Sequence, residues 1–310
     1  LYNNGNYENS KIKFEKVIKK ESKNYMGYSG LGSNYFKQRN FEKAIEYFKK
    51  AIELNTSNSN LYKGLGWSYY YLENYEKAIE TLEKGLELNP DDELILEGLG
   101  KSYYEIEDYE KTKNIYIKII KKNPTKLEGY NQLGWLYYNL KDYENAIFNF
   151  NKGLDLEPEN KYSNFGLAST YQNLKKYNES INYAKKIIEY DKEFFDAYDI
   201  LAFDYYLLKN YNQSYYYILK IDENEMKVNT YCLKGSIELE INKINYAKNS
   251  YEKAFNLDNN YLSALLGLGY SHILLNDCKK GMYYLNQSLI NNTNINHTKK
   301  IKNIENKWCS

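Results

Sequence analysis

The sequence holds little cysteine and no excess of one charge, and each shortage excludes a class of protein. Cys232, Cys278 and Cys309 are an odd number at wide spacings with no CxxC pair, so neither a disulfide framework nor a zinc site is indicated and a reduced compartment is expected. No apolar run approaches the roughly 18 to 20 residues that span a bilayer. The 42 basic residues are offset by 41 acidic ones, so the strongly basic surface expected of a nucleic-acid-binding protein is missing.

Proline is equally scarce, and its spacing indicates a repeat. Pro90, Pro124 and Pro158 are the only prolines, and each follows the last by 34 residues. A fixed period of about 20 to 50 residues is typical of repeat architectures. Tyrosine, by contrast, is abundant with 38 residues, and Arg39 is the only arginine among the basic residues. This bias is typical of a low-GC genome, so part of the tyrosine excess is expected to carry no function.

Placing the prolines at position 32 of a 34-residue unit brings the rest of the chain into register. Leucine then stands at position 7 in seven of eight units, glycine or alanine at position 8 in all eight, and tyrosine at position 11 in six. The units span residues 25–58, 59–92, 93–126, 127–160, 161–194, 195–227, 228–261 and 262–295, after a truncated leading unit at 1–24 and before a C-terminal capping helix at 296–310.

These columns of small and aromatic residues resemble the tetratricopeptide repeat, and the resemblance covers almost the whole chain. It implies an all-α fold, a right-handed α-solenoid, or superhelix, in which each 34-residue unit is an antiparallel pair of helices, A and B. The residues agree with this interpretation. Leu61, Leu65 and Tyr69 recur at helical spacing, and a second helical pattern begins at Tyr75 after a break near Glu73.

No group of residues predicts catalysis. His272 and His297 are the only histidines, and neither has a cysteine or aspartate at a recognised catalytic spacing. His272 replaces a position 11 tyrosine, so a structural role is expected. The GLG triplets lie inside expected helices and none completes GxGxxG after a strand. We therefore expect a protein that is not an enzyme and has no cofactor, metal or small-molecule substrate.

The resemblance implies a concave groove lined by helix A, mainly at positions 2, 5, 9, 12 and 13. The candidates there for binding a protein or peptide are Lys63, Trp67, Tyr70, Lys101, Tyr104, Asn131, Trp135, Tyr138, Phe203 and Tyr206. Rigid aromatic side chains lose little entropy on contact and are enriched at binding hot spots. One alternative stays open, because packing and codon bias would also place tyrosine at position 12.

The carboxylate clamp of chaperone-tail binding tetratricopeptide domains is not expected. Its polar and basic positions are occupied here by Ser29, Ser33, Gly64 and Leu94. Residues 59–126, 127–194 and 195–261 carry net charges of −3, −2 and −3, whereas both ends are basic. This acidic middle favours a partner with a basic or neutral segment, although salt screens the preference over about 8 to 10 Å.

The sequence thus predicts a non-catalytic scaffold that binds a protein or peptide, with neither nucleic acid nor a membrane span. A peptide-sensing regulatory array and an accessory region of a larger enzyme, whose other domain lies outside this chain, are the alternatives. The chain begins at Leu1 without the features of a signal peptide, so a fragment or processed product in the cytoplasm is expected.

Overall fold

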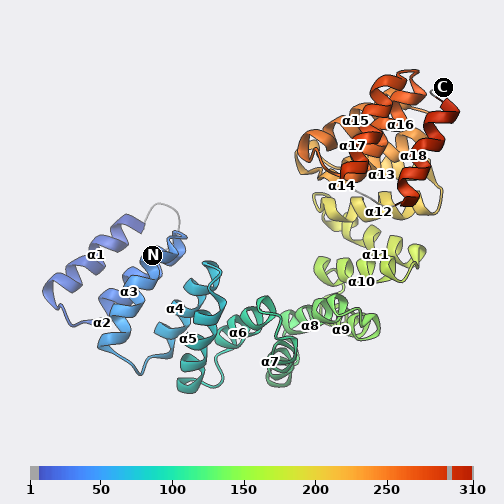
Figure 1. The fold of residues 1–310 in the computed structure, drawn as a ribbon. Coiled ribbons are helices and arrows are strands. Elements are labelled where there is room, and N and C mark those ends of the chain that lie inside the picture. The colour runs from blue at the N-terminus through green and yellow to red at the C-terminus, as the bar shows by residue number, and fades with distance from the viewer. Residues whose placement is uncertain (1–6, 292–294, 309–310) are drawn as a thin grey trace. The chain divides into compact units, whose positions relative to one another are not determined.

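The computed structural model describes residues 7–291 and 295–308, and every regular element in these residues is a helix. The chain forms two compact units, Leu1–Leu140 and Lys141–Ser310. In each unit, helices that are consecutive in the sequence pack side by side as pairs (Figure 1). Among the described residues, no helix has both the length and the apolar character needed to cross a membrane.

Eight helices make up the first unit. They are α1 (Tyr7–Lys20), α2 (Tyr25–Lys37), α3 (Phe41–Leu54), α4 (Ser59–Tyr71), α5 (Tyr75–Leu88), α6 (Glu93–Glu105), α7 (Tyr109–Lys122) and α8 (Leu127–Asn139).

The second unit continues the same alternation. Its helices are α9 (Tyr143–Leu156), α10 (Lys161–Asn173), α11 (Tyr177–Tyr190), α12 (Phe195–Leu207), α13 (Tyr211–Ile218), the short 3-10 helix η1 (Glu223–Glu225), α14 (Val228–Glu240), α15 (Ile244–Leu257), α16 (Leu262–Leu274), α17 (Cys278–Asn291) and α18 (Ile295–Trp308).

The A helices, which are the even-numbered helices from α2 to α16, begin at the residues where the sequence pattern starts each unit. Local hydrogen bonds explain several of these starts. Asn24, Asn58 and Asp92 each accept a hydrogen bond, 3.0 Å long, from the backbone N–H two residues further on. Such an N-cap stabilises a helix by about 1 kcal/mol relative to alanine. Part of the asparagine in this chain therefore has a structural role.

A large side chain at position 24 of helix B holds neighbouring units together. Phe48 of α3 fits between two glycines, because a Cβ added to Gly32 would lie 3.0 Å from its ring and one added to Gly64 only 2.4 Å away. Tyr251 of α15 fits between Gly235 and Gly267 in the same way, at 2.8 and 2.2 Å. The GLG triplets thus provide space for helix packing, which offsets the cost of glycine in a helix interior.

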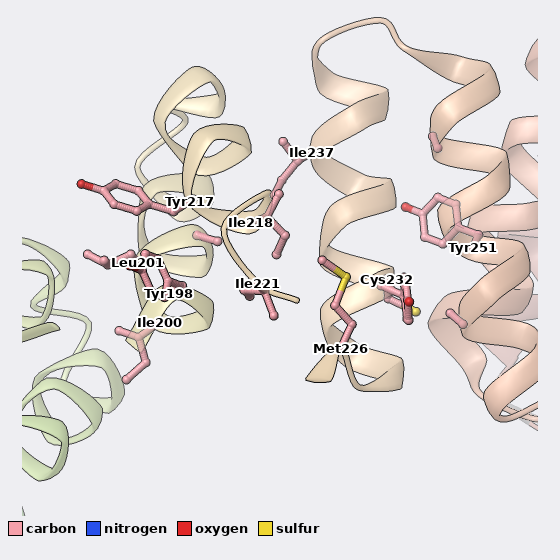
Figure 2. Close-up of a cluster of buried hydrophobic side chains, with 14 of the residues drawn as sticks. Tyr198, Ile200, Leu201, Tyr217, Ile218, Ile221, Met226, Cys232, Ile237 and Tyr251 are labelled. Atoms are coloured by element: carbon pink, nitrogen blue, oxygen red, sulfur yellow. The ribbon is translucent and has the colours of Figure 1, made fainter. Parts of the chain in front are cut away.

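The core of the second unit is centred on helices α12 to α15 (Figure 2). Here α13 has eight residues, whereas the flanking helices α11 and α15 have 14. Ile221 and Met226, from the connection that follows α13, are buried in the core instead. The unit 195–227, which is one residue short, therefore keeps a continuous core although its second helix ends early.

The last helix, α18, covers the segment where a capping helix is expected. Ile301 is buried and Ile304 half-buried, in a cluster with Ile273 and Leu285. This contact covers apolar surface of the last repeat, as a terminal cap does in a solenoid. The side chain of Trp308, the third apolar residue of the pattern, lies outside the described part of the chain.

The cysteines require one correction. Cys278 forms a disulfide, whereas Cys232 is a free and buried thiol. The wide sequence spacing was read as giving no indication of a disulfide framework, and the bond at Cys278 departs from that reading because pairing depends on distance in the fold.

Candidate functional site

The A helices form a layer of neighbours in each unit. In the first unit α2 contacts α4 and α4 contacts α6, and in the second unit α10, α12, α14 and α16 contact one another in the same order. All ten candidate residues lie on these A helices. Seven of them line three cavities, two form a further aromatic pair, and Asn131 is buried.

The first cavity, of about 540 Å³, opens among α2, α4 and α6. Its walls are mainly apolar and include Phe36, Phe48, Trp67, Tyr71 and Leu94, with Lys63 also lining it. Ligand sites are typically clefts of about 300 to 1,000 Å³ with apolar walls and a few polar groups. This cavity has the size and the lining of such a site.

Trp67 is held in one orientation at this cavity. Its indole Nε1–H donates to the Leu94 carbonyl oxygen at 3.0 Å. Its ring lies 5.4 Å from that of Tyr70 at an interplanar angle of 77°. The hydrogen bond uses the only polar group of the side chain. The indole therefore presents an apolar surface to a partner and loses little side-chain entropy on binding.

Both candidate lysines form internal ion pairs. Lys63 Nζ lies 2.8 Å from Asp92 Oδ2, and Lys101 Nζ lies 3.3 Å from Glu97 Oε1. Burial acts to raise the pKa of Asp92, but the hydrogen bonds from Lys63 and from backbone N–H groups prevail and lower it. A partner would therefore meet neutral pairs here, not free cations.

Tyr70, Lys101 and Tyr104 line a second cavity of about 210 Å³ in the same unit. The position 12 tyrosines also pack within their own repeats, since Tyr70 lies 5.7 Å from Tyr75 and Tyr104 lies 5.8 Å from Tyr109, measured between ring centroids. Burial raises the pKa of Tyr70 to about 12. These tyrosines pack within their repeats and also line a cavity. Packing and partner binding can therefore both account for tyrosine at position 12.

The remaining candidates of the first unit lie on α8, outside the cavities described. Trp135 and Tyr138 repeat the geometry of Trp67 and Tyr70, with ring centroids 5.3 Å apart at 81°. Asn131 is buried, with 5% of its surface exposed, which makes it poorly accessible to a partner.

Phe203 and Tyr206 line a third cavity, of about 240 Å³, among α12, α14 and α16 of the second unit. Phe203 is exposed, whereas Tyr206 packs 5.7 Å from Tyr211 and has its pKa raised by burial. Asp199 and Cys232 also line this cavity.

Among the described residues, no group of three or more His, Cys, Asp or Glu side chains could hold a metal ion. His272 is buried and stacks on Tyr284 at 5.6 Å. Burial raises the pKa of the Cys232 thiol to about 12, so the thiol stays protonated and weakly nucleophilic. The side chain of His297 lies outside the described part.

Sequence reasoning missed part of the first cavity. Phe48 of helix B, which the sequence did not single out, belongs to the core and also lines the cavity. The signal available was Gly64, which leaves the space next to the Phe48 ring open. Phe36, which also lines the cavity, gave no such signal.

The comparisons with known families agree with the repeat geometry. Family profiles described as tetratricopeptide repeat match residues 26–91, 96–126, 127–160, 162–194 and 228–261, which together exceed half of the chain. The chain is a tetratricopeptide repeat (TPR) protein. No curated protein matches it in sequence.

Solved structures similar to this TPR protein share its fold at low identity. A tetratricopeptide repeat protein from Parabacteroides merdae is 21% identical with a TM-score of 0.62, over 80% of this chain and 98% of that one. PilW, a widely conserved type IV pilus biogenesis factor, is 19% identical with a TM-score of 0.58, over 66% and 94%. YrrB, described as having an unusual peptide-binding site, is 20% identical with a TM-score of 0.50, over 59% and 95%.

Proposed function

We propose that this TPR protein is a non-catalytic scaffold that binds a protein or peptide segment along its A helices. The observation that carries the proposal is the 540 Å³ cavity of the first unit, where aromatic walls surround an indole fixed by its hydrogen bond to Leu94. A fixed aromatic surface binds with a small entropic cost, which is typical of hot spots. The peptide-binding site described for YrrB supports the same use of a TPR fold.

The polar groups of this cavity favour an apolar anchor on the partner. Lys63 and Glu97 line the cavity, and each is neutralised by an ion pair within the chain. A charged side chain entering the cavity would have to break one of these pairs without gaining a free counter-ion. The expected partner therefore inserts an apolar or aromatic side chain next to Trp67.

A paired substitution tests the proposal. Trp67→Ala combined with Trp135→Ala is expected to weaken capture of a partner by tenfold or more, about 1.4 kcal/mol, while circular dichroism shows unchanged helicity. Phe148→Ala is the matched control, because Phe148 is an aromatic residue of helix B with 57% exposure. Equal binding of the double variant and the control variant would exclude the A-helix surface as the site.

The proposed location remains the cytoplasm, as the sequence predicts. The disulfide at Cys278 argues in the other direction, because disulfides persist in oxidising compartments. Labelling of free thiols in the native protein distinguishes a reducing from an oxidising compartment. A Cys278 that is labelled without reductant would favour the cytoplasm.

A further inference from the structure

A carboxylate without a counter-ion lines the third cavity. Asp199, on α12, is half-buried, and its Oδ1 is shielded from solvent without a hydrogen-bond partner in the described part of the chain. Thr230 on α14 provides a side-chain hydrogen bond to Asp199, but burial prevails and raises the pKa of the carboxyl group. A cation that enters the cavity would favour the ionised form of this carboxyl group, which burial alone disfavours.

The neighbouring charges do not neutralise Asp199. Lys227 acts on it electrostatically, but the Lys227 ammonium is exposed and lies 3.1 Å from Asp196 Oδ1, with which it forms its ion pair. Asp196 in turn repels a second negative charge. An anionic ligand is thus disfavoured, and a cationic one would supply the missing charge.

Aromatic rings form much of the cavity wall around this carboxylate. Phe203 and Tyr206 of α12 and Tyr261, the residue that precedes α16, all line it. Rings attract an organic cation over their faces, more strongly when the pair is desolvated. A metal ion fits less well, because no set of three acidic, cysteine or histidine ligands exists among the described residues.

We propose that this cavity binds an organic cation, namely the lysine ammonium or arginine guanidinium of a partner segment, with Asp199 as its counter-ion. The proposal rests on the scaffold function above and specifies the partner's chemistry at the second unit. The cavity volume of about 240 Å³ is below the range of about 300 to 1,000 Å³ for whole-ligand sites, which suits one side chain. The net charge of −3 over residues 195–261 is complementary to such a segment.

The test uses small probes of defined charge on the full chain. Binding of Nα-acetyl-lysine N-methylamide is compared with that of the neutral Nα-acetyl-norleucine N-methylamide by NMR shift titration. Lysine is expected to bind at least tenfold more tightly than norleucine. Equal binding of the two probes would overturn the proposal, because charge would then contribute nothing.

Two matched variants assign the effect to one carboxylate. Asp199→Asn keeps the shape and removes the charge, and it is expected to weaken lysine binding at least tenfold. Asp196→Asn, three residues away and exposed, is expected to weaken binding much less than Asp199→Asn does. Loss of lysine binding in Asp196→Asn with retention in Asp199→Asn would overturn the assignment.

Folding and the wider function are controlled separately. Circular dichroism checks that both variants keep wild-type helicity, and if Asp199→Asn unfolds, the lysine against norleucine comparison on the wild-type chain still decides the proposal. The groove substitutions at Trp67 and Trp135 lie in the other unit. Weakened capture in those variants together with equal probe binding would overturn the cation site while keeping the scaffold function.

Discussion

Individual charged residues of this chain differ sharply in how their charge is balanced. Lys63 retains an ion pair at the first cavity, with Asp92 Oδ2 2.8 Å from its ammonium. Asp204, on α12, is fully buried and accepts a hydrogen bond from Gln172 Nε2 at 2.8 Å through Oδ1, and a hydrogen bond from Ser180 also acts on its carboxyl group. Burial raises the pKa of Asp204 to about 6.

This shift predicts the sign of a pH dependence. Below the ordinary pKa of 3.8 the carboxyl group is protonated in both the folded and the unfolded chain. As the pH rises to about 6 the unfolded chain loses the proton first, so the free energy of unfolding of the second unit falls by up to about 3 kcal/mol. Above that pH the penalty is constant.

Asp204→Asn should remove this penalty. We expect the variant to gain stability relative to wild type at pH 7.5 and to differ little at pH 4, measured by urea unfolding at both values. Asp196→Asn, at an exposed residue in the same helix, is the control and should show a much smaller pH-dependent gain. A variant that is less stable than wild type at pH 7.5 would show that the charged form of Asp204 stabilises the fold.

At this scale the repeat register placed Trp67 at position 9, and its side chain lines a cavity. Its role in binding stays a prediction. Burial of Asp204 was not foreseen, although its register gave a signal: position 10 holds Ser68, Ser102 and Thr170 in other units, and all three are fully buried. The ion pairs of Lys63 and Lys101 also depend on distances between repeats, which spacing alone does not give.

At the scale of elements, the turns between helices A and B share one conformation. Each turn contains a residue with positive φ, between 58° and 63°, and these residues are Arg39, Glu73, Glu107, Lys141, Lys175, Lys209, Asn242 and Asn276. After α4, for example, the Asn74 N–H donates to the Tyr69 carbonyl oxygen at 3.0 Å, five residues back. This left-handed helix end directs the chain into the next helix and usually favours glycine or asparagine.

The conformation predicts a stabilising substitution. Glu107→Gly should raise the free energy of unfolding by about 0.5 to 1 kcal/mol, because glycine adopts positive φ without steric cost. Asn242→Gly is the matched control and should change stability little, since asparagine tolerates this region. Thermal or chemical unfolding measures both, and a loss of stability in Glu107→Gly would contradict the account of these turns.

Element boundaries were the most predictable part of this molecule. The helical periods and the break near Glu73 agree with α4 ending at Tyr71 and α5 beginning at Tyr75. The early end of α13 and the 3-10 helix at Glu223–Glu225 were not predicted. One missing residue shows that a connection has changed, but it does not show which helix turns are lost.

At the scale of the whole molecule, the repeat geometry predicts which units can be removed. Deleting 59–92 would bring Gly98 into the place of Gly64, so Phe48 would still pack on a glycine. Deleting 93–126 would instead place Gln132, the residue in the same register, opposite Leu82. We expect both proteins to stay helical by circular dichroism, with the first more stable in urea.

The reverse order of stability would contradict the packing of position 24 against glycine. Loss of all helicity in both deletions would contradict the repeat organisation itself, because a solenoid is stabilised mainly by contacts between neighbouring units.

The central claim, that a partner binds along the A helices, is tested most directly by the indole N–H signals of the chain. Only three tryptophans exist, Trp67, Trp135 and Trp308, so ¹⁵N–¹H spectra of the indoles are simple, and single Trp→Phe variants assign them. On titration with a captured partner, the signals of Trp67 and Trp135 should shift while that of Trp308 stays in place. Saturating binding that leaves Trp67 and Trp135 unshifted would contradict the account.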